Sequence, residues 1–167
     1  PDFQTRIEEL LVHAHAGRPA SVPRGPGGET YEAASIRVVA SGGKMDLHCE
    51  AETGGLPSMS HLASLVDVFA QLSFFVTLAP SESGGELHIS ALRVDDAPAK
   101  MLPRMDERAD EETLRSLDPF GELVVRPAAG DLLLFNGGRF FHRVAPIVGS
   151  RPRWTVGGFV ARSLDGK

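Results

Sequence analysis

The stretch KMDLHCE, residues 44–50, alternates apolar and polar side chains with the period of two that a β-strand requires. In such a strand His48 and Glu50 project to the same face, where both side chains can bind one ion. Cys49 between them then points the other way, into packing. Considered alone, this His-x-Glu triplet is explained more simply as the polar edge of a strand.

Short strands are predicted along the rest of the chain as well. A strand over 35–40 is joined to 44–50 by the turn at 41–43, as in a hairpin. The other predicted strands span residues 72–78, 85–92, 122–126, 131–135, 139–145 and 153–161. Helices are predicted at the start of the chain up to residue 14, from Ser60 to about Gln71, and near 110–117 within the charged segment 95–119. About eight short strands with few helices indicate a β-sandwich or a squat barrel with helices packed outside.

Length, charge and cysteine content narrow the class of protein further. A chain of 167 residues is expected to form one domain. The net charge of −5 gives no electrostatic support for nucleic-acid binding, and no apolar run approaches the ~20 residues of a membrane helix. The lone Cys49 rules out an internal disulfide and suits a cytoplasmic location. The sequence begins at Pro1 rather than Met, which leaves room for a missing N-terminal piece.

A second histidine gives the His-x-Glu triplet more weight. His142 lies in the apolar, strand-forming stretch RFFHRV, residues 139–144. If it meets His48 and Glu50, the three side chains form the two-histidine, one-carboxylate face that is diagnostic of non-haem Fe(II) oxygenases. A buried structural histidine is the alternative. His88, in a strand near Glu86, is the best competitor for a metal role.

Two arginines and a threonine follow His142 along the chain, at alternate positions. Arg151, Arg153 and Thr155 share strand parity and can project to one side. An arginine deep in a barrel needs an anionic partner, and a dicarboxylate supplies one. A pair of surface arginines beside a proline is the ordinary alternative. Arg37, together with Arg139 and Arg143, could contact an acidic substrate group, although exposed salt bridges explain these residues equally well.

Several motifs occur in an order that resembles the Fe(II)/2-oxoglutarate-dependent dioxygenases of the prolyl-hydroxylase-like type. The resemblance covers residues 35–161, and its end is especially similar to bacterial enzymes that act on amino acids or natural products. Its motifs are His48-x-Glu50, the strand 73–78 with SESGGEL at 81–87, PAAGDLLLF at 127–135, NGGR at 136–139, HRVAP at 142–146, Arg151 with Trp154-Thr155, and GGF at 157–159.

The resemblance implies a fold and a set of site residues. The fold is a mainly β double-stranded β-helix, or jelly roll, with flanking helices. One domain over 1–167 is expected, with its core at 35–161 and an N-terminal helix and loop at 1–34. The implied iron ligands are His48, Glu50 and His142. For 2-oxoglutarate, Arg151 aligns best with the basic residue that binds the distal carboxylate, Arg153 is the alternative, and Ser73, Thr77 and Thr155 are candidate hydroxyl partners.

The implied activity is hydroxylation of a small molecule, either an amino acid or a natural-product intermediate, with O2 consumed and succinate and CO2 released. Most relatives carry Asp where this chain has Glu50, and relatives that halogenate have lost this carboxylate so that chloride can bind the iron. Glu50 therefore argues against halogenation. Three alternatives stay open: epimerisation, desaturation or cyclisation with the same cofactors, a cupin-like metal-binding jelly roll, and a non-catalytic ligand-binding barrel. The oligomeric state stays open as well.

Overall fold

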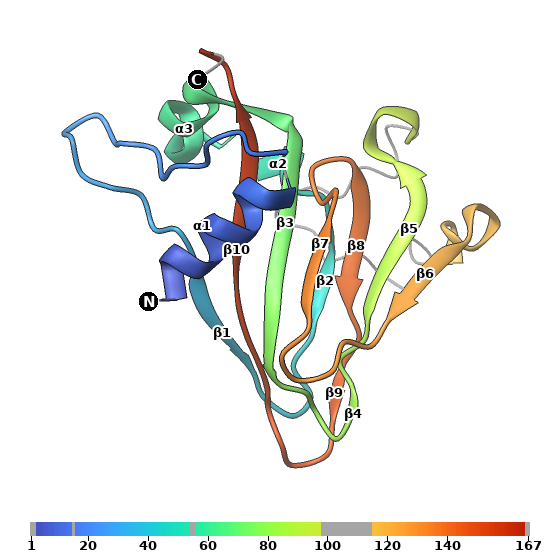
Figure 1. Cartoon of the computed structure of the whole chain (residues 1–167). Coiled ribbons are helices and arrows are strands. Elements are labelled where there is room, and N and C mark those ends of the chain that lie inside the picture. The colour runs from blue at the N-terminus through green and yellow to red at the C-terminus, as the bar shows by residue number, and fades with distance from the viewer. Residues whose placement is uncertain (1–2, 15, 54–55, 98–114, 166–167) are drawn as a thin grey trace.

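Two four-stranded antiparallel sheets face each other and form the body of the protein (Figure 1). The computed structural model describes residues 3–14, 16–53, 56–97 and 115–165. Sheet I has the order β1 (Ser35–Val39), β10 (Arg153–Ser163), β3 (Val66–Ala79) and β7 (Leu132–Phe135). Sheet II has the order β2 (Met45–His48), β8 (Phe140–Val144), β5 (Leu87–Arg93) and β6 (Glu122–Val125). A small third sheet pairs β4 (Ser83–Gly84) with β9 (Ile147–Val148).

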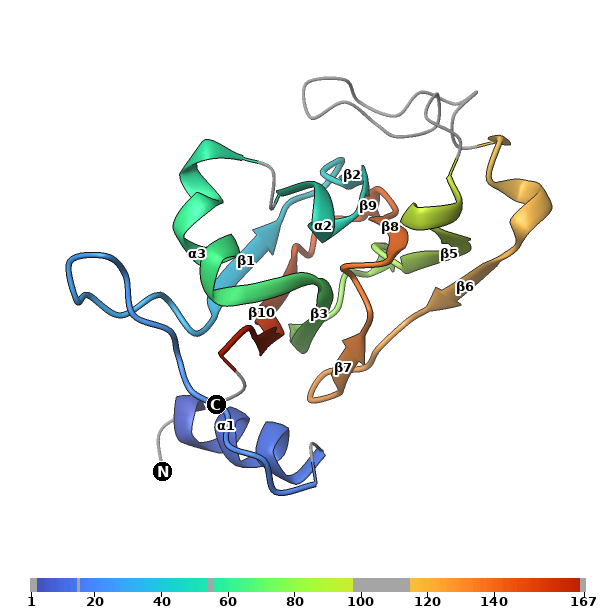
Figure 2. The ribbon, with the colours of Figure 1, turned by 90° about the horizontal axis from the view of Figure 1, so that it is seen from above.

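Three α-helices and three short 3-10 helices flank the sheets within the described residues. The α-helices are α1 (Phe3–Ala14), α2 (Glu50–Thr53) and α3 (Ser60–Leu65), and the 3-10 helices are η1 (Pro57–Met59), η2 (Val94–Asp96) and η4 (Asp118–Phe120). Helix α1 lies on the outer side of sheet I, away from sheet II (Figure 2), and buries Ile7. The strand order and the outer helices confirm the predicted jelly roll.

The hydrophobic core behind sheet II fixes the strands that carry the histidines. Leu47, Cys49, Leu92 and Phe141 form one buried cluster. Cys49 is fully buried, and its thiol donates to the carbonyl oxygens of Gly137 and Gly138. Because side chains alternate along a strand, packing Leu47 and Phe141 into this cluster turns the neighbouring histidines toward sheet I. The predicted outward packing of Cys49 is confirmed.

The predicted hairpin between 35–40 and 44–50 is wrong. β1 pairs with β10, and β2 pairs with β8, so the connection crosses from one sheet to the other. The backbone groups of this connection bond elsewhere: Gly42 N donates to Ile147 O, and Ile147 N donates to Gly43 O. The turn at 41–43 therefore links two edge strands of opposite sheets.

The predicted helix over residues 60–71 is too long. It ends at Leu65, and β3 begins at Val66, six residues before the strand predicted from 72. The C-terminal half of β10 supplies the backbone partners, since Arg162 pairs with Asp67 and Ser163 with Val66. This pairing overrides the helical spacing of the apolar residues. The helix predicted near 110–117 lies largely outside the described residues.

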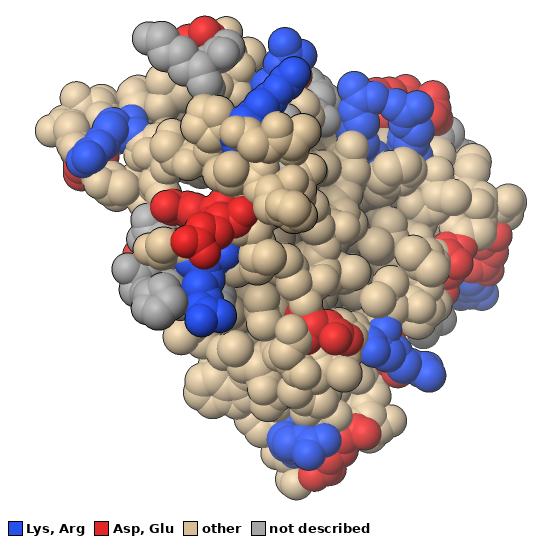
Figure 3. All heavy atoms as spheres, viewed as in Figure 1, with Lys and Arg blue, Asp and Glu red and all other residues tan. Residues whose placement is uncertain are grey.

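Charged residues on the face shown in Figure 3 form small groups in which Lys or Arg commonly lies near Asp or Glu, and wide areas between these groups carry no charged residue.

Among the described residues, we find no helix with the length and apolar character needed to span a membrane.

Candidate metal centre

The pairing of β2 with β8 brings the two predicted histidines together. His48 and His142 are direct partners in the register, so their side chains leave the same face of sheet II. Their ring centroids lie 4.3 Å apart. His48 Nδ1 lies 2.7 Å from Asp46 O, and His142 Nδ1 lies 2.9 Å from Phe140 O. A carbonyl only accepts, so each Nδ1 carries a proton, and in the neutral ring each Nε2 offers its lone pair to a metal.

The carboxylate of the predicted triplet comes from a helix rather than from the strand. β2 ends at His48, and Glu50 is the first residue of α2. Its backbone N donates to Gly137 O at 3.0 Å. Glu50 Oε1 then lies 3.1 Å from His142 Nε2 and 3.8 Å from His48 Nε2. The same face that strand alternation predicts is reached through the first turn of α2.

These three side chains fit a divalent metal ion. Their ligand atoms all lie within 4.8 Å of one another. With both rings neutral, these three atoms offer lone pairs close enough together for one cation to bind among them. Glu50 and His142 are buried, whereas the side chain of His48 is 31% exposed, so the centre opens to one side. Two imidazoles and one carboxylate are the donor set of non-haem Fe(II) sites.

The protonation states also suit metal binding. Burial, and next the charge of His142, lower the pKa of His48, which favours the neutral ring that binds metal. For Glu50, burial acts to raise the pKa. The hydrogen bond and charge of His142 in its protonated form outweigh it, with smaller effects from His48 and the Ser73 hydroxyl, and hold the pKa of Glu50 below its usual range. The carboxylate is therefore ionised and available as a ligand.

Gly137 provides the space that the Glu50 carboxylate occupies. A Cβ atom added to Gly137 would lie 2.9 Å from Glu50 Cδ and would overlap both Glu50 Oε2 and Ser73 Oγ. Sequence reasoning did not identify this residue as part of the centre. The available signal was the double glycine of NGGR, which appeared only as part of the resemblance. It also did not identify Phe135, whose ring meets the His142 ring edge-on at 4.9 Å.

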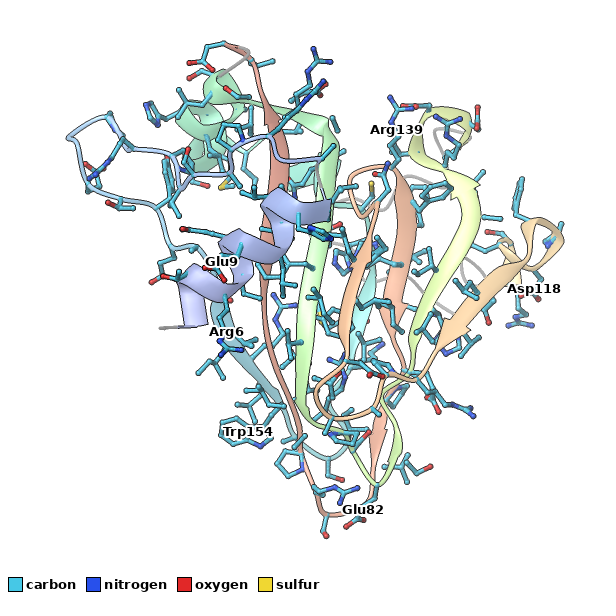
Figure 4. The ribbon with its side chains drawn as sticks, in the orientation of Figure 1. Arg6, Glu9, Glu82, Asp118, Arg139 and Trp154 are labelled. Carbon is cyan, nitrogen blue, oxygen red and sulfur yellow. The ribbon has the colours of Figure 1, made fainter. Side chains whose placement is uncertain are left out.

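The first residues of β10 line the space between sheets I and II that the metal centre also faces, called the inner space below. Arg153, Thr155 and Thr77 are all buried, with Thr155 and Thr77 paired across β10 and β3. The Arg153 guanidinium lies over the Phe75 ring, 4.9 Å from its centroid, and within the described residues it meets no carboxylate. Burial, and next the charge of Arg37, lower the pKa of Arg153. Trp154, between the two buried residues, is 40% exposed and lies on the β1 side of sheet I (Figure 4).

Of the other predicted candidates, Arg151 and His88 lie outside this inner space, whereas Ser73 lies within it. Arg151 precedes β10 in an exposed connection, where its Nη2 donates to Ser81 O. His88 contacts Glu122 at 3.0 Å and Arg143 at 3.0 Å. Its ring therefore belongs to a separate polar cluster and does not join His48 and His142. The predicted co-substrate residue Ser73 lies next to Glu50 and is buried.

A jelly roll that gathers two histidines and one carboxylate on its inner face carries the donor set of the non-haem Fe(II) oxygenases. Within that class, the family model of the carrier-protein-independent halogenase WelO5 matches residues 1–167, and the chain belongs to this family. Membership confirms the resemblance inferred from the sequence. Iron and 2-oxoglutarate are the cofactors of this enzyme class.

Solved structures share the fold at low sequence identity. An N-substituted L-amino acid dioxygenase from Burkholderia ambifaria AMMD, solved in complex with alpha-KG, superimposes with a TM-score of 0.61 at 18% identity, over 97% of this chain and 62% of that protein. AviO1 from Streptomyces viridochromogenes Tue57 gives a TM-score of 0.52 at 13% identity, over 93% of this chain and 56% of that protein. The chain thus spans little more than half the length of these structures. No curated protein sequence matches it.

Proposed function

We propose that this chain is an Fe(II)- and 2-oxoglutarate-dependent oxygenase that hydroxylates a small molecule and releases succinate and CO2. The observation that carries the proposal is the convergence of His48, Glu50 and His142 on one point of the inner face. Two histidines held by backbone carbonyls and one ionised carboxylate suit Fe(II) and leave room for further ligands. When bound, the iron would activate dioxygen together with the 2-oxo acid.

For 2-oxoglutarate, we assign the distal carboxylate to Arg153 rather than to Arg151. Arg153 is a buried cation with no acidic partner among the described residues, and a buried guanidinium is stabilised by a bidentate carboxylate. The Thr77 hydroxyl is also buried and finds no hydrogen-bond partner in the described part of the chain, so it is available to donate to the same carboxylate. Arg151 lies in an exposed connection. A cupin-like metalloprotein would have no use for a buried cation of this kind.

Hydroxylation is favoured over halogenation because Glu50 retains the carboxylate that halogenating relatives lack. The carboxylate is buried, faces both histidines, and fits the space left by Gly137. A chloride ion would need the coordination position that this carboxylate takes. The family bears the name of a halogenase, and the proposal assigns this chain a different outcome within it.

The chain's own residues would position the reactants and limit access by water. The Nδ1 bonds of His48 and His142 fix both rings, and α2 holds the Glu50 carboxylate between them. A cavity of about 410 Å³ adjoins the β7–β8 connection and is lined in part by Asn136 and Phe140. Its size suits a small molecule. Arg139, the residue before β8, also lines this cavity, and Figure 4 shows its side chain near the ends of β5 and β8.

The experiment is an anaerobic titration of the protein with Fe(II) and then 2-oxoglutarate, following the visible charge-transfer band of a chelated 2-oxo acid. We expect the band in the wild type and in His61→Ala, and its loss in His142→Ala. Iron binding without the band would favour a cupin-like metalloprotein, and no iron binding would favour a non-catalytic barrel. A chloride titration then tests the outcome: chloride should leave the wild-type band unchanged and alter it in Glu50→Gly. A chloride-dependent wild-type band would refute the assignment of hydroxylation.

A further inference from the structure

Arg37 lies on the inner face of β1, between the two sheets. Its neighbours Ile36 and Val38 are 65% and 46% exposed on the outer face. Val39 is buried, and Arg37, although exposed, contacts Met45 of sheet II, so the alternation of β1 turns these two side chains inward. In the register of sheet I, Val39 pairs with Arg153 and Arg37 pairs with Thr155. Arg37 is thus one inward position further along the sheet than the pair that contains the buried arginine, about 7 Å away along the strand.

The guanidinium of Arg37 reaches across to the opposite sheet but meets no acid there. Its Nη1 donates to Met45 Sδ on β2 at 3.3 Å, and a thioether is a weak acceptor. The other two arginines that sequence reasoning considered for acidic ligands have carboxylate partners. Arg139 lies 3.7 Å from Asp95, and Arg143 lies 3.7 Å from Glu122. Across the described ranges, Arg37 has no such partner.

Arg37 lies close both to Arg153 and to the strand that carries His48. Its contact with Met45 places its guanidinium at the start of β2, whose last residue is His48. On the other side, its charge is the cause that, after burial, lowers the pKa of Arg153. A ligand that extends from the metal centre to Arg153 would pass this guanidinium.

We propose that Arg37 is a second cationic contact for 2-oxoglutarate and binds the carboxylate at its 2-oxo end, while Arg153 binds the distal carboxylate. This inference rests on the proposed function. The two inward-facing arginines carry two positive charges without acidic partners, and 2-oxoglutarate is a dianion, so the ligand compensates both. Arg37 is exposed, so its guanidinium is accessible to a ligand from solvent.

The test compares two 2-oxo acids that differ only at the distal end. Protein loaded anaerobically with Fe(II) is titrated with 2-oxoglutarate and with 2-oxobutyrate, which keeps the 2-oxo acid but has no second carboxylate. The variants are Arg37→Gln, Arg37→Lys and Arg153→Gln, and the matched control is Arg126→Gln, which removes an exposed arginine from the end of β6. Kd and the wavelength of the charge-transfer band are measured for each, with thermal unfolding to confirm that each variant is folded.

We expect Arg37→Gln to raise the Kd of both acids about tenfold, the loss expected for one charge-assisted hydrogen bond, and to shift the band. Arg153→Gln should weaken 2-oxoglutarate alone, and Arg37→Lys should retain most of the affinity. Unchanged affinities in Arg37→Gln would overturn the inference and leave Arg37 to the substrate. Weakening of 2-oxoglutarate without 2-oxobutyrate would also overturn it, because Arg37 would then act at the distal end. No band in the wild type would refute the proposed function itself.

Discussion

Adding a single methyl group at Gly137 should displace the Glu50 carboxylate from the metal centre. In Gly137→Ala the new Cβ would lie 2.9 Å from Glu50 Cδ, whereas ordinary contact begins at 3.4 Å, so the side chain must move by at least 0.5 Å. The Ser73 hydroxyl overlaps the same position. The backbones cannot move apart freely, because Glu50 N is bonded to Gly137 O at 3.0 Å. The displacement therefore falls on the Glu50 and Ser73 side chains.

Two magnitudes follow from this displacement. Overpacking a filled site destabilises a protein by about 1–3 kcal/mol, so the free energy of unfolding of the metal-free protein should fall by about 2 kcal/mol. Misplacing a group that orients a metal ligand lowers affinity by about 10–100-fold, and we expect the Kd for Co(II), a spectroscopic substitute for Fe(II), to rise within that range. Urea denaturation measures the first effect and anaerobic Co(II) titration the second.

A control and a rescue separate this mechanism from a general effect of the mutation. Gly27→Ala adds the same methyl in an exposed loop, where it meets only the flexible end of Glu29, and should change neither quantity. Ser73→Ala in the Gly137→Ala background removes one of the two overlaps and should restore part of the stability. If Gly137→Ala unfolds and binds Co(II) like the wild type, the account of Gly137 as the space for Glu50 is refuted.

Three further predictions concern the inner space. Thr77→Val should stabilise the ligand-free protein by about 1 kcal/mol in urea, because it removes a buried hydroxyl without a partner, and should weaken 2-oxoglutarate binding; a loss of stability would contradict this. Arg153→Gln should raise the Kd for 2-oxoglutarate at least about tenfold, and Arg151→Gln should leave it nearly unchanged; the reverse order would move the contact to Arg151. Because the pKa of His48 is lowered from 6.5, the unfolded chain binds more protons below that pH, and the metal-free protein should lose stability as pH falls from 6.5. In His48→Asn that part of the pH dependence should be absent, and an unchanged slope would count against it.

The sequence predicted the strands of the site because their alternation is local. The pattern around His48 and around His142 is set by which neighbours are apolar, and burial of Leu47 and Phe141 realises that pattern. Both histidines therefore face inward as expected. The pairing of β2 with β8 depends on the order of strands in space, for which the ordered motifs of the resemblance supplied the only guide.

The errors in the fold arise where long-range pairing decides the structure. Residues 66–71 satisfy a helical spacing, yet the partner strand β10 supplies hydrogen bonds that a short helix could not match. The turn at 41–43 has the glycines of a hairpin, yet its backbone groups bond to Ile147. In both cases the deciding partner is distant in sequence, and no local pattern contains it.

Strand alternation could not decide whether Arg151 or Arg153 binds the distal carboxylate, because residues two apart face the same side of a strand. What distinguishes them is where β10 begins. The structure places that start at Arg153, so one arginine is inside the sheet and the other in an exposed connection. The distance from His142 is set by β9 and the connection after it. Spacing along the chain therefore limited the candidates to two, and the beginning of one strand separates them.

The inner face of the jelly roll carries polar groups that a sheet packed only for stability would not keep. Among the described residues, Thr77 Oγ1 and Asn136 Oδ1 are buried without partners, and Arg153 is buried without an acid. A buried unsatisfied polar group costs about 1–3 kcal/mol, against a total stability of about 5–15 kcal/mol for a domain. A ligand that satisfies these groups stabilises the folded state, and the stabilisation grows with the logarithm of the ligand concentration relative to its Kd. The polar groups between the sheets therefore link stability to co-substrate binding: 2-oxoglutarate should raise the unfolding temperature of the wild type, and it should do so less in the more stable Thr77→Val.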